Sequence, residues 1–205
     1  FLSMNFLLFL AAAVLGYYLI PGRLQWVWLL LFSYLFYLAS GTWAAVFILT
    51  TTLTTFLGGL CLERADLRLA LILRSIENPI PRQKKILKER YRKYKKWITA
   101  AVLLINFGIL AVLKYRNFAV ENISRMFGAP YPPGNLLLPL GISFYTFQSM
   151  GYLIDVYRGK YPPDHNPFRF ALFVSFFPQI LQGPIGRYDR LSDQLFGQRT
   201  FCLSR

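Results

Sequence analysis

Acidic side chains, histidine and cysteine are all scarce in this sequence of 205 residues. It has nine Asp and Glu against 23 Lys and Arg, one histidine and two cysteines. Charged residues of both signs make up only 16% of the chain, against roughly 25% in average soluble domains. So little polar surface could not cover the large apolar segments described below. The composition therefore excludes an ordinary soluble domain.

The motifs of common soluble enzymes are also absent. There is no G-x-S-x-G elbow, H-E-x-x-H motif, P-loop or G-x-G-x-x-G loop. The single histidine, His165, lies in the proline-rich stretch 161–167, where nothing positions it as a general base. We interpret it as a surface residue. Cys61 and Cys202 belong to no metal-type cluster, so we predict neither a catalytic residue nor a metal ligand.

Long apolar runs dominate what is present. Four uncharged segments of 17 to 20 residues occupy positions 4–20, 24–40, 43–62 and 97–113. A bilayer core of about 30 Å needs ~20 such residues as a helix. We therefore predict an all-α, polytopic transmembrane helix bundle forming one membrane domain over residues 1–205. Two further apolar stretches, described below, bring the expected number of membrane segments to five or six, including a broken or re-entrant helix.

Positive charge is concentrated between the third and fourth apolar segments. Residues 63–96 hold 12 Lys and Arg and four Asp and Glu, which is +8 of the net +14. This pattern is typical of a cytoplasmic loop, so we predict a multi-pass plasma (inner) membrane protein with its N-terminus outside, and no nucleic-acid binding. The loop contains either an amphipathic surface helix lying on anionic membrane lipids or a solvated charged face. Residues 115–135 are expected to form an external loop that can include a short helix.

Polar side chains interrupt the apolar stretch 136–156. At 100° per residue, Tyr145, Gln148, Tyr152 and Asp155 share one arc of about 80° with Gly141. Polar groups in a membrane helix face the bundle interior or a water-filled cavity, and apolar residues such as Ile142 and Leu153 are expected on the other sides. The four polar residues are candidate tunnel-lining residues. Hydrogen bonding between helices is an equally good explanation.

A second polar stripe lies in residues 168–182. Ser175, Gln179 and Gln182 fall within about 60° on one face. The stretch contains Pro178, and the following Gly-Pro-Ile-Gly run at 183–186 predicts a break in the helix. A broken helix is tolerated at membrane depth only where it lines protein or a cavity. These three residues and Arg187 complete the tunnel-lining candidates. Asp155, near Arg158 and Lys160, is better explained as part of an interfacial ion cluster than as an acid or base.

Two sequence blocks resemble the membrane-bound O-acyltransferase family, in its alginate and peptidoglycan O-acetylation branch. The first is Leu-Pro-Leu-Gly-Ile-Ser-Phe-Tyr-Thr-Phe-Gln at 138–148, continuing through Tyr-Leu-Ile-Asp-Val-Tyr-Arg-Gly at 152–159. The second runs from Phe170 to Gln179 and on through Gly-Pro-Ile to Arg187-Tyr188. The layout of the N-terminal segments and the basic loop is also similar.

The resemblance implies an enzyme that moves an acyl group, most simply acetyl, onto a cell-envelope polysaccharide. No bound cofactor is implied. The substrate would be an acyl donor such as acetyl-CoA or a similar thioester, and an extracytoplasmic partner protein is one route by which the acceptor would be reached. The family's catalytic histidine lies further along the chain than residue 205, and His165 does not match it. We therefore expect an N-terminal portion, a fragment that is inactive alone.

Two other functions stay open on the residues alone. Broken helices and intramembrane polar groups also occur in secondary transporters and flippases, although the chain shows no internal repeat of its first four segments. A purely structural membrane subunit would fit the topology but would not explain the polar stripes.

Overall fold

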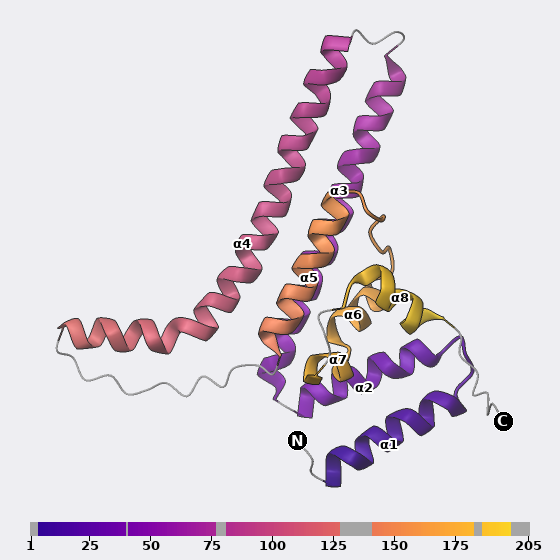
Figure 1. The fold of residues 1–205 in the computed structure, drawn as a ribbon, viewed down its shortest axis with the longest axis vertical. Helices are drawn as coiled ribbons and strands as arrows, with labels where there is room; N and C mark the ends of the chain where they lie inside the picture. The colour runs from indigo at the N-terminus through magenta and orange to yellow at the C-terminus, as the bar shows by residue number, and fades with distance from the viewer. Residues whose placement is uncertain (1–3, 40, 77–80, 128–140, 183–185, 198–205) are drawn as a thin grey trace.

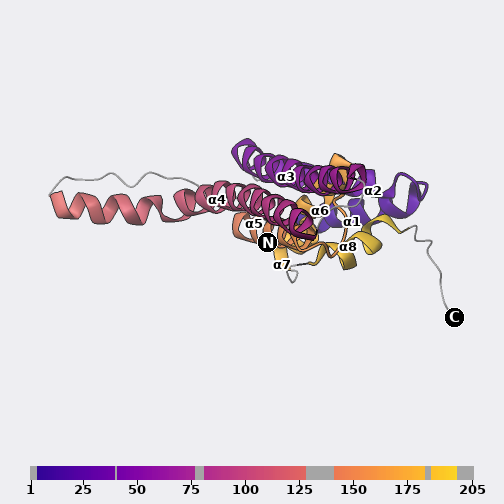
Figure 2. The same cartoon turned by 90° about the horizontal axis from the view of Figure 1, so that it is seen from above.

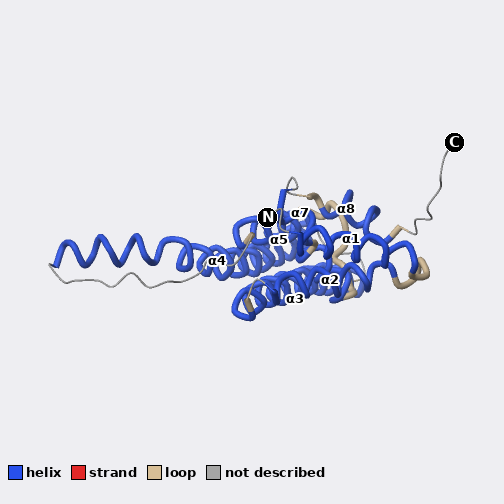
Figure 3. Tube along the Cα trace, turned by 90° about the horizontal axis from the view of Figure 1, so that it is seen from below, coloured by secondary structure: helices blue, strands red, loops and turns tan. Residues whose placement is uncertain are grey.

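The computed structural model describes residues 4–39, 41–76, 81–127, 141–182 and 186–197, and all regular structure in these ranges is helical (Figures 1 and 3). This confirms the all-α prediction. The eight helices are α1 (Met4–Leu19), α2 (Gln25–Ala39), α3 (Thr42–Ser75), α4 (Pro81–Phe127), α5 (Ile142–Tyr157), α6 (Pro167–Ser175), α7 (Phe177–Gln182) and α8 (Tyr188–Phe196).

Helices α3 and α4 form a long antiparallel hairpin that extends well beyond the rest of the molecule (Figure 1). They contain 34 and 47 residues, and the segments 45–75 and 81–116 are long and apolar enough to cross a membrane. The basic segment 63–96 is thus mostly a continuation of two membrane-length helices. Residues 63–75 and 81–96 are helical, which fits the helix expected in the basic segment. Its position on the cytoplasmic side stays a prediction, and residues 77–80 lie outside the described part.

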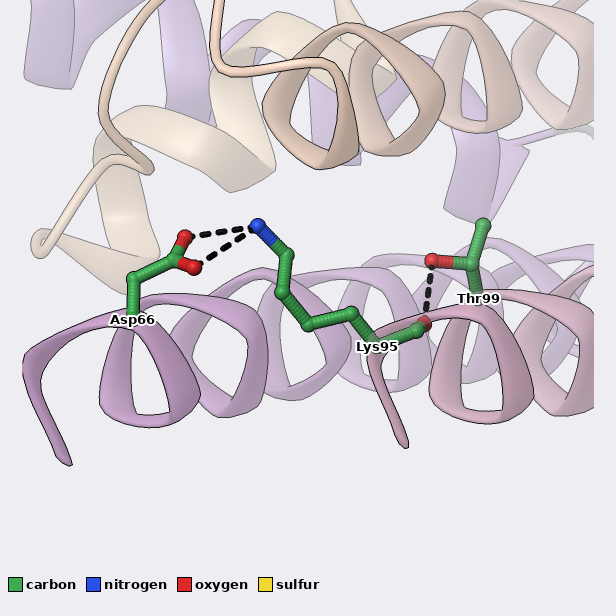
Figure 4. A network of polar contacts seen from close by, with 3 residues as sticks. All are labelled: Asp66, Lys95 and Thr99. Carbon is green, nitrogen blue, oxygen red and sulfur yellow. Dashed lines mark hydrogen bonds and ion pairs between the residues drawn. The ribbon is translucent and has the colours of Figure 1, made fainter. Parts of the chain in front are cut away.

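Polar contacts join the two arms of this hairpin. Lys95 Nζ donates to both carboxylate oxygens of Asp66 at 2.7 and 2.9 Å, and Thr99 Oγ1 donates to the Lys95 carbonyl (Figure 4). Closer to the bundle, the buried Asn106 donates to Thr54 Oγ1 at 3.0 Å. The Asp66–Lys95 and Thr54–Asn106 contacts fix the register of α3 against α4, whereas the Thr99 bond lies within α4.

The first two helices are shorter than the hairpin helices. With 16 and 15 residues, α1 and α2 fall below the ~20 residues that span a bilayer core. They run beside each other and across the direction of α3 (Figure 1). Phe9 of α1 stacks on Phe32 of α2 and on Phe177 of α7. The two membrane-length helices fit a membrane protein, but five to six membrane segments stay a prediction.

The C-terminal part of α4 leaves the bundle. The helix bends, and its last turns run away from the other elements (Figures 1 and 2). Residues 115–127 are helical and continue α4, so the helix here is longer than the short one expected. The external position of this segment stays a prediction, and residues 128–135 are not described. Polar residues alone do not end a helix, and no proline falls between Pro81 and residue 127.

Helices α5 to α8 fill the angle between the hairpin and α2. α5 packs on α3 and α4, while α6 packs on α2, α3 and α5 (Figure 1). Gly141 precedes α5 with φ of 69°, and a Cβ built there would lie 2.2 Å from Ile180 Cγ2. Glycine is needed for both the left-handed conformation and the close approach of α7. Residues 136–140 of the predicted helix lie outside the described range.

Candidate functional site: a polar seam beside a broken helix

The predicted helix 168–182 is broken at Phe176, earlier than the break expected at residues 183–186. α6 ends at Ser175, Phe176 has an extended ψ of 100°, and α7 starts at Phe177. Pro178 is the second residue of α7, where a missing N–H costs little. In an uninterrupted helix its ring would clash with the carbonyl of Val174 and break the helix. The Gly-Pro-Ile residues 183–185, predicted to interrupt the helix, are not described.

The break removes one specific backbone hydrogen bond, and two other helices supply replacements. In a continuous helix the Phe177 N–H would donate to the Phe173 carbonyl. Instead, Gln148 Nε2 of α5 donates to the Phe173 carbonyl at 3.0 Å, and the Phe177 N–H donates to Ser33 Oγ of α2 at 3.5 Å. Gln148 and Ser33 are 2% and 0% exposed. Buried backbone groups are thereby satisfied at the one place where the helix cannot do so.

The two predicted polar stripes meet here. Gln148 Nε2 lies 3.4 Å from Gln179 Oε1, so the central residue of the α5 stripe contacts the second stripe directly. Ser175 is fully buried at the end of α6, and Gln179 is half-buried. We define the polar seam as six side chains on α2, α5, α6 and α7: Tyr37, Tyr145, Gln148, Ser149, Ser175 and Gln179.

Hydrogen-bonding capacity is left over in this seam. Tyr37 and Tyr145 face each other with ring centroids 6.4 Å apart, and both side chains are fully buried. Their hydroxyls have no hydrogen-bond partner among the described residues. The same holds for Ser149 Oγ, Ser175 Oγ and Gln148 Oε1. An unsatisfied buried polar group costs about 1–3 kcal/mol. Hydrogen bonding between helices therefore explains why the amide nitrogen of Gln148 is buried, but not why the unpaired hydroxyls and the amide oxygen are buried.

Tyr152 lies on the same face of α5 but belongs to an aromatic cluster. Its ring stacks on Phe170 and Tyr188 at 4.7 and 4.9 Å, and its hydroxyl accepts from the Asp164 N–H at 2.9 Å. The Tyr188 hydroxyl donates to the Asp164 carboxylate. Burial, and then this carboxylate, raise the pKa of Tyr188, so the phenol stays protonated at neutral pH. The cluster orders the loop before α6.

The other candidates are not part of the seam. Asp155 forms an ion pair with Lys160, the geometry expected of an interfacial ion cluster. Arg187 is exposed at the start of α8, and the Gln182 side chain is not described. His165 is exposed and contacts Glu63 of α3 at 2.9 Å, as expected for a surface residue. Whether any of these residues lines a tunnel stays a prediction.

The apolar side of α5 is buried as well as its polar side. Ile142 and Leu153, placed away from the polar arc, are 6% and 0% exposed. The exposed positions are Phe147, at 48%, and Gly151. α5 packs on several elements at once, so only a narrow strip of its surface is free. A helical wheel finds the polar face but cannot show how many neighbours the helix has.

Several polar residues of the core were missed. Ser33 and Tyr37 lie one turn apart on α2, and Asn106 lies within the apolar part of α4. Each is a polar side chain inside an apolar run, which is itself a sign of an inward-facing position. Among the described residues no group of three or more His, Cys, Asp and Glu is placed to hold a metal.

These features define a class of protein: an all-helical chain with membrane-length helices and a buried, uncharged polar seam at a broken helix. Comparison with characterised proteins confirms the family resemblance over part of the chain. Its matches are enzymes that acylate cell-envelope polymers. No family model matches the chain, and neither does any solved structure.

Three relatives illustrate the similarity. A probable alginate O-acetylase AlgI from Pseudomonas aeruginosa is 41% identical over 120 residues, covering 57% of this chain and 23% of the relative. A peptidoglycan O-acetyltransferase from Helicobacter pylori is 30% identical over 125 residues (49% and 24%). A teichoic acid D-alanyltransferase from Bacillus subtilis is 38% identical over 60 residues (29% and 15%). The matched regions span about a quarter or less of these curated relatives.

Proposed function

We propose that the chain is the N-terminal part of a membrane-bound O-acyltransferase that transfers an acetyl group to hydroxyls of a cell-envelope polysaccharide. The observation that carries this proposal is the 41% identity over 120 residues to a probable alginate O-acetylase. A peptidoglycan O-acetyltransferase and a D-alanyltransferase among the relatives support the coarser statement of acyl transfer to an envelope polymer. No relative supports the alternative of a transporter or flippase subunit.

In this proposal the polar seam forms part of the acyl path. Its free hydroxyls can donate to a thioester carbonyl, and these hydroxyls and the free amide oxygen of Gln148 can accept from a sugar hydroxyl. They are held on four helices by dense aromatic packing, which keeps donors and acceptors in place. Positioning, rather than proton transfer, is the role we assign to Tyr145, Gln148 and Ser175.

The reaction would be attack of an acceptor hydroxyl on the acyl carbonyl of a thioester such as acetyl-CoA. The C–O bond forms, the C–S bond breaks, and the hydroxyl proton passes to a general base. The seam side chains are amides and hydroxyls, and none is a base near neutral pH. The exposed His165 contacts Glu63, outside the seam. We therefore propose that the base comes from a part of the enzyme other than these residues.

Location and partners complete the proposal. We place the protein in the plasma membrane with its N-terminus outside. The basic segment 63–96 then lies on the cytoplasmic side, where positive charge accumulates. The acceptor polysaccharide would then be reached outside, through an extracytoplasmic partner. Reversing the charges across residues 84–96 tests this topology. Labelling of the hairpin from the cytoplasmic side should fall and labelling from the outside should rise. Unchanged accessibility of both sides would contradict the assignment.

The decisive experiment is genetic and chemical together. Deleting the gene should remove O-linked acetyl from one envelope polysaccharide, measured as acetate released by mild alkali from each purified polymer. The wild-type gene should restore it. Ser175→Ala should restore less, while Ser192→Ala, at a half-buried serine of α8 outside the polar seam, should restore it fully. Normal acetylation of every envelope polymer in the deletion strain would refute the proposal.

A further inference from the structure

The helical hairpin carries an open groove between its two arms. The groove has a volume of about 640 Å³ and is lined by α3 from Cys61 to Ile72 and by α4 from Leu87 to Tyr94. Three arginines line it: Arg64 and Arg68 of α3, one turn apart, and Arg90 of α4. We call this feature the arginine groove.

The arginine groove carries only positive charge. Its lining contains no carboxylate, and within the described part of the hairpin no ion pair involves Arg64, Arg68 or Arg90. Like charges held close together destabilise a structure, so an anion bound among them is favoured. Guanidinium groups bind phosphate through paired N–H donors, with more geometric specificity than a lysine ammonium group.

The groove lies at the level where a lipid headgroup would be. The Asp66–Lys95 pair sets the register of the two arms. Arg64 precedes Asp66 by two residues and Trp97 follows Lys95 by two, so both lie slightly closer to the bundle. Trp97 and Tyr94 are 75% and 54% exposed, and exposed Trp and Tyr are enriched at membrane–water interfaces. The uncharged run 97–113 of α4 starts at this level.

An apolar strip continues from the groove toward the bundle. Ala101 and Ile105 follow Tyr94 by seven and eleven residues, so they lie on the same face of α4. Both are exposed, Ile105 at 49%. Together these positions offer a cationic headgroup site with a path for an acyl chain below it. A soluble phosphate compound would use the groove and leave the strip uncovered.

We propose that the arginine groove binds one anionic phospholipid, with its phosphate among Arg64, Arg68 and Arg90 and an acyl chain along Ala101 and Ile105. This site is independent of the proposed acyl transfer. It also differs from a non-specific attraction of the basic hairpin to the membrane, because only one face of each helix takes part.

A charge-matched pair of variants tests the proposal in the detergent-solubilised full-length protein. R64Q/R68Q/R90Q removes three charges from the groove, and K85Q/R92Q/K96Q removes three from the opposite face of α4. Phosphatidylglycerol and phosphatidylcholine are titrated, and retained lipid is counted by native mass spectrometry. We expect the groove variant to retain phosphatidylglycerol at least about tenfold more weakly, since several charge-assisted bonds are lost. The control should stay within about twofold of wild type.

Other outcomes overturn the proposal. Equal losses in both triple variants would mean general charge attraction. Displacement of the lipid by equimolar inorganic phosphate or coenzyme A would mean a site for a soluble phosphate compound. If the groove variant is not monodisperse, R64K/R68K/R90K replaces it, because it keeps the charge and loses the paired donors. This variant should bind with intermediate affinity, and wild-type affinity would also contradict the assignment.

Discussion

The polar seam and the arginine groove use opposite physical means to create a site. The seam is buried and uncharged, and several of its hydroxyls have no partner among the described residues. The groove is exposed and carries three like charges. In a low-dielectric interior each hydrogen bond is stronger and an unpaired polar group is costly, so the position of each side chain is critical. Solvated charges interact weakly and act mainly through their sign and number. Substitutions in the seam region should therefore have larger effects than those in the hairpin.

The largest effect is expected at the glycine that lets α7 approach α5. Gly141→Ala places a Cβ in a left-handed position and 2.2 Å from Ile180 Cγ2, which should destabilise the protein by about 2–4 kcal/mol. Gly151→Ala on the same helix meets open space and should be neutral or stabilising by about 0.5–1 kcal/mol. The thermal midpoints of the two detergent-solubilised variants are compared, and that of Gly141→Ala should be clearly lower. Similar midpoints would show that α7 does not depend on this contact.

The next effect concerns the side chain that replaces the broken backbone bond. Gln148→Leu leaves the Phe173 carbonyl without its donor, which should lower acetylation by about tenfold, equivalent to ~1.4 kcal/mol, while membrane insertion is unchanged. Gln179→Leu should have a smaller effect, since its contact is longer. The exposed Gln83→Leu serves as the control. Normal acetyl transfer by membrane-inserted Gln148→Leu would remove the seam from the proposed path.

A smaller effect is expected where the hairpin enters the bundle. Asn106→Leu removes the hydrogen bond to Thr54 between α4 and α3 and should cost about 0.5–1.5 kcal/mol. Asn122 is exposed and bonds only its own helix, to the Phe118 carbonyl, so Asn122→Leu should change the thermal midpoint little. A larger loss for Asn122→Leu would mean that stability depends on the projecting end of α4.

Periodicity and composition predicted much of this arrangement. The helical class was predicted from the lengths of the apolar runs, and the inward polar faces from the 100° spacing. A break was expected at residues 183–186, whereas the observed one at Phe176 lies two residues before Pro178. The length of the helix over residues 115–127 was underestimated because the polar composition resembles a loop, although no glycine or proline interrupts α4 there. In the basic segment, the proline stretch 78–81 divides two arms that are helical on either side.

The pairing across the seam could not be predicted in the same way. A helical wheel places Gln148 and Gln179 on inward faces but says nothing of which helices meet. The contact arises because the helix breaks at Phe176, which frees one carbonyl and one N–H for Gln148 and Ser33. Such pairing depends on tertiary packing, which cannot be predicted from the local sequence of either helix. The arginine groove is easier to predict from sequence, because Arg64 and Arg68 lie on one helix face by their i, i+4 spacing. Only the position of Arg90 beside them depends on the register of α3 against α4.

The smallest effect should appear at the ion pair that sets this register. Lys95 is only 14% exposed, whereas its partner Asp66 is 55% exposed. A double-mutant cycle with Asp66→Asn and Lys95→Gln should give a coupling free energy of about 0.5–1 kcal/mol, the upper range for surface pairs. The Glu121–Arg125 pair within α4 is exposed on both sides and should give about 0.3–0.5 kcal/mol. Both cycles are measured as thermal midpoints at low and high salt, because screening weakens exposed pairs more. If the Asp66–Lys95 coupling instead vanished with salt as fully as the Glu121–Arg125 coupling does, the ion pair would not set the register of α3 against α4. In that case apolar packing would have to hold Arg64 at the lipid-headgroup level.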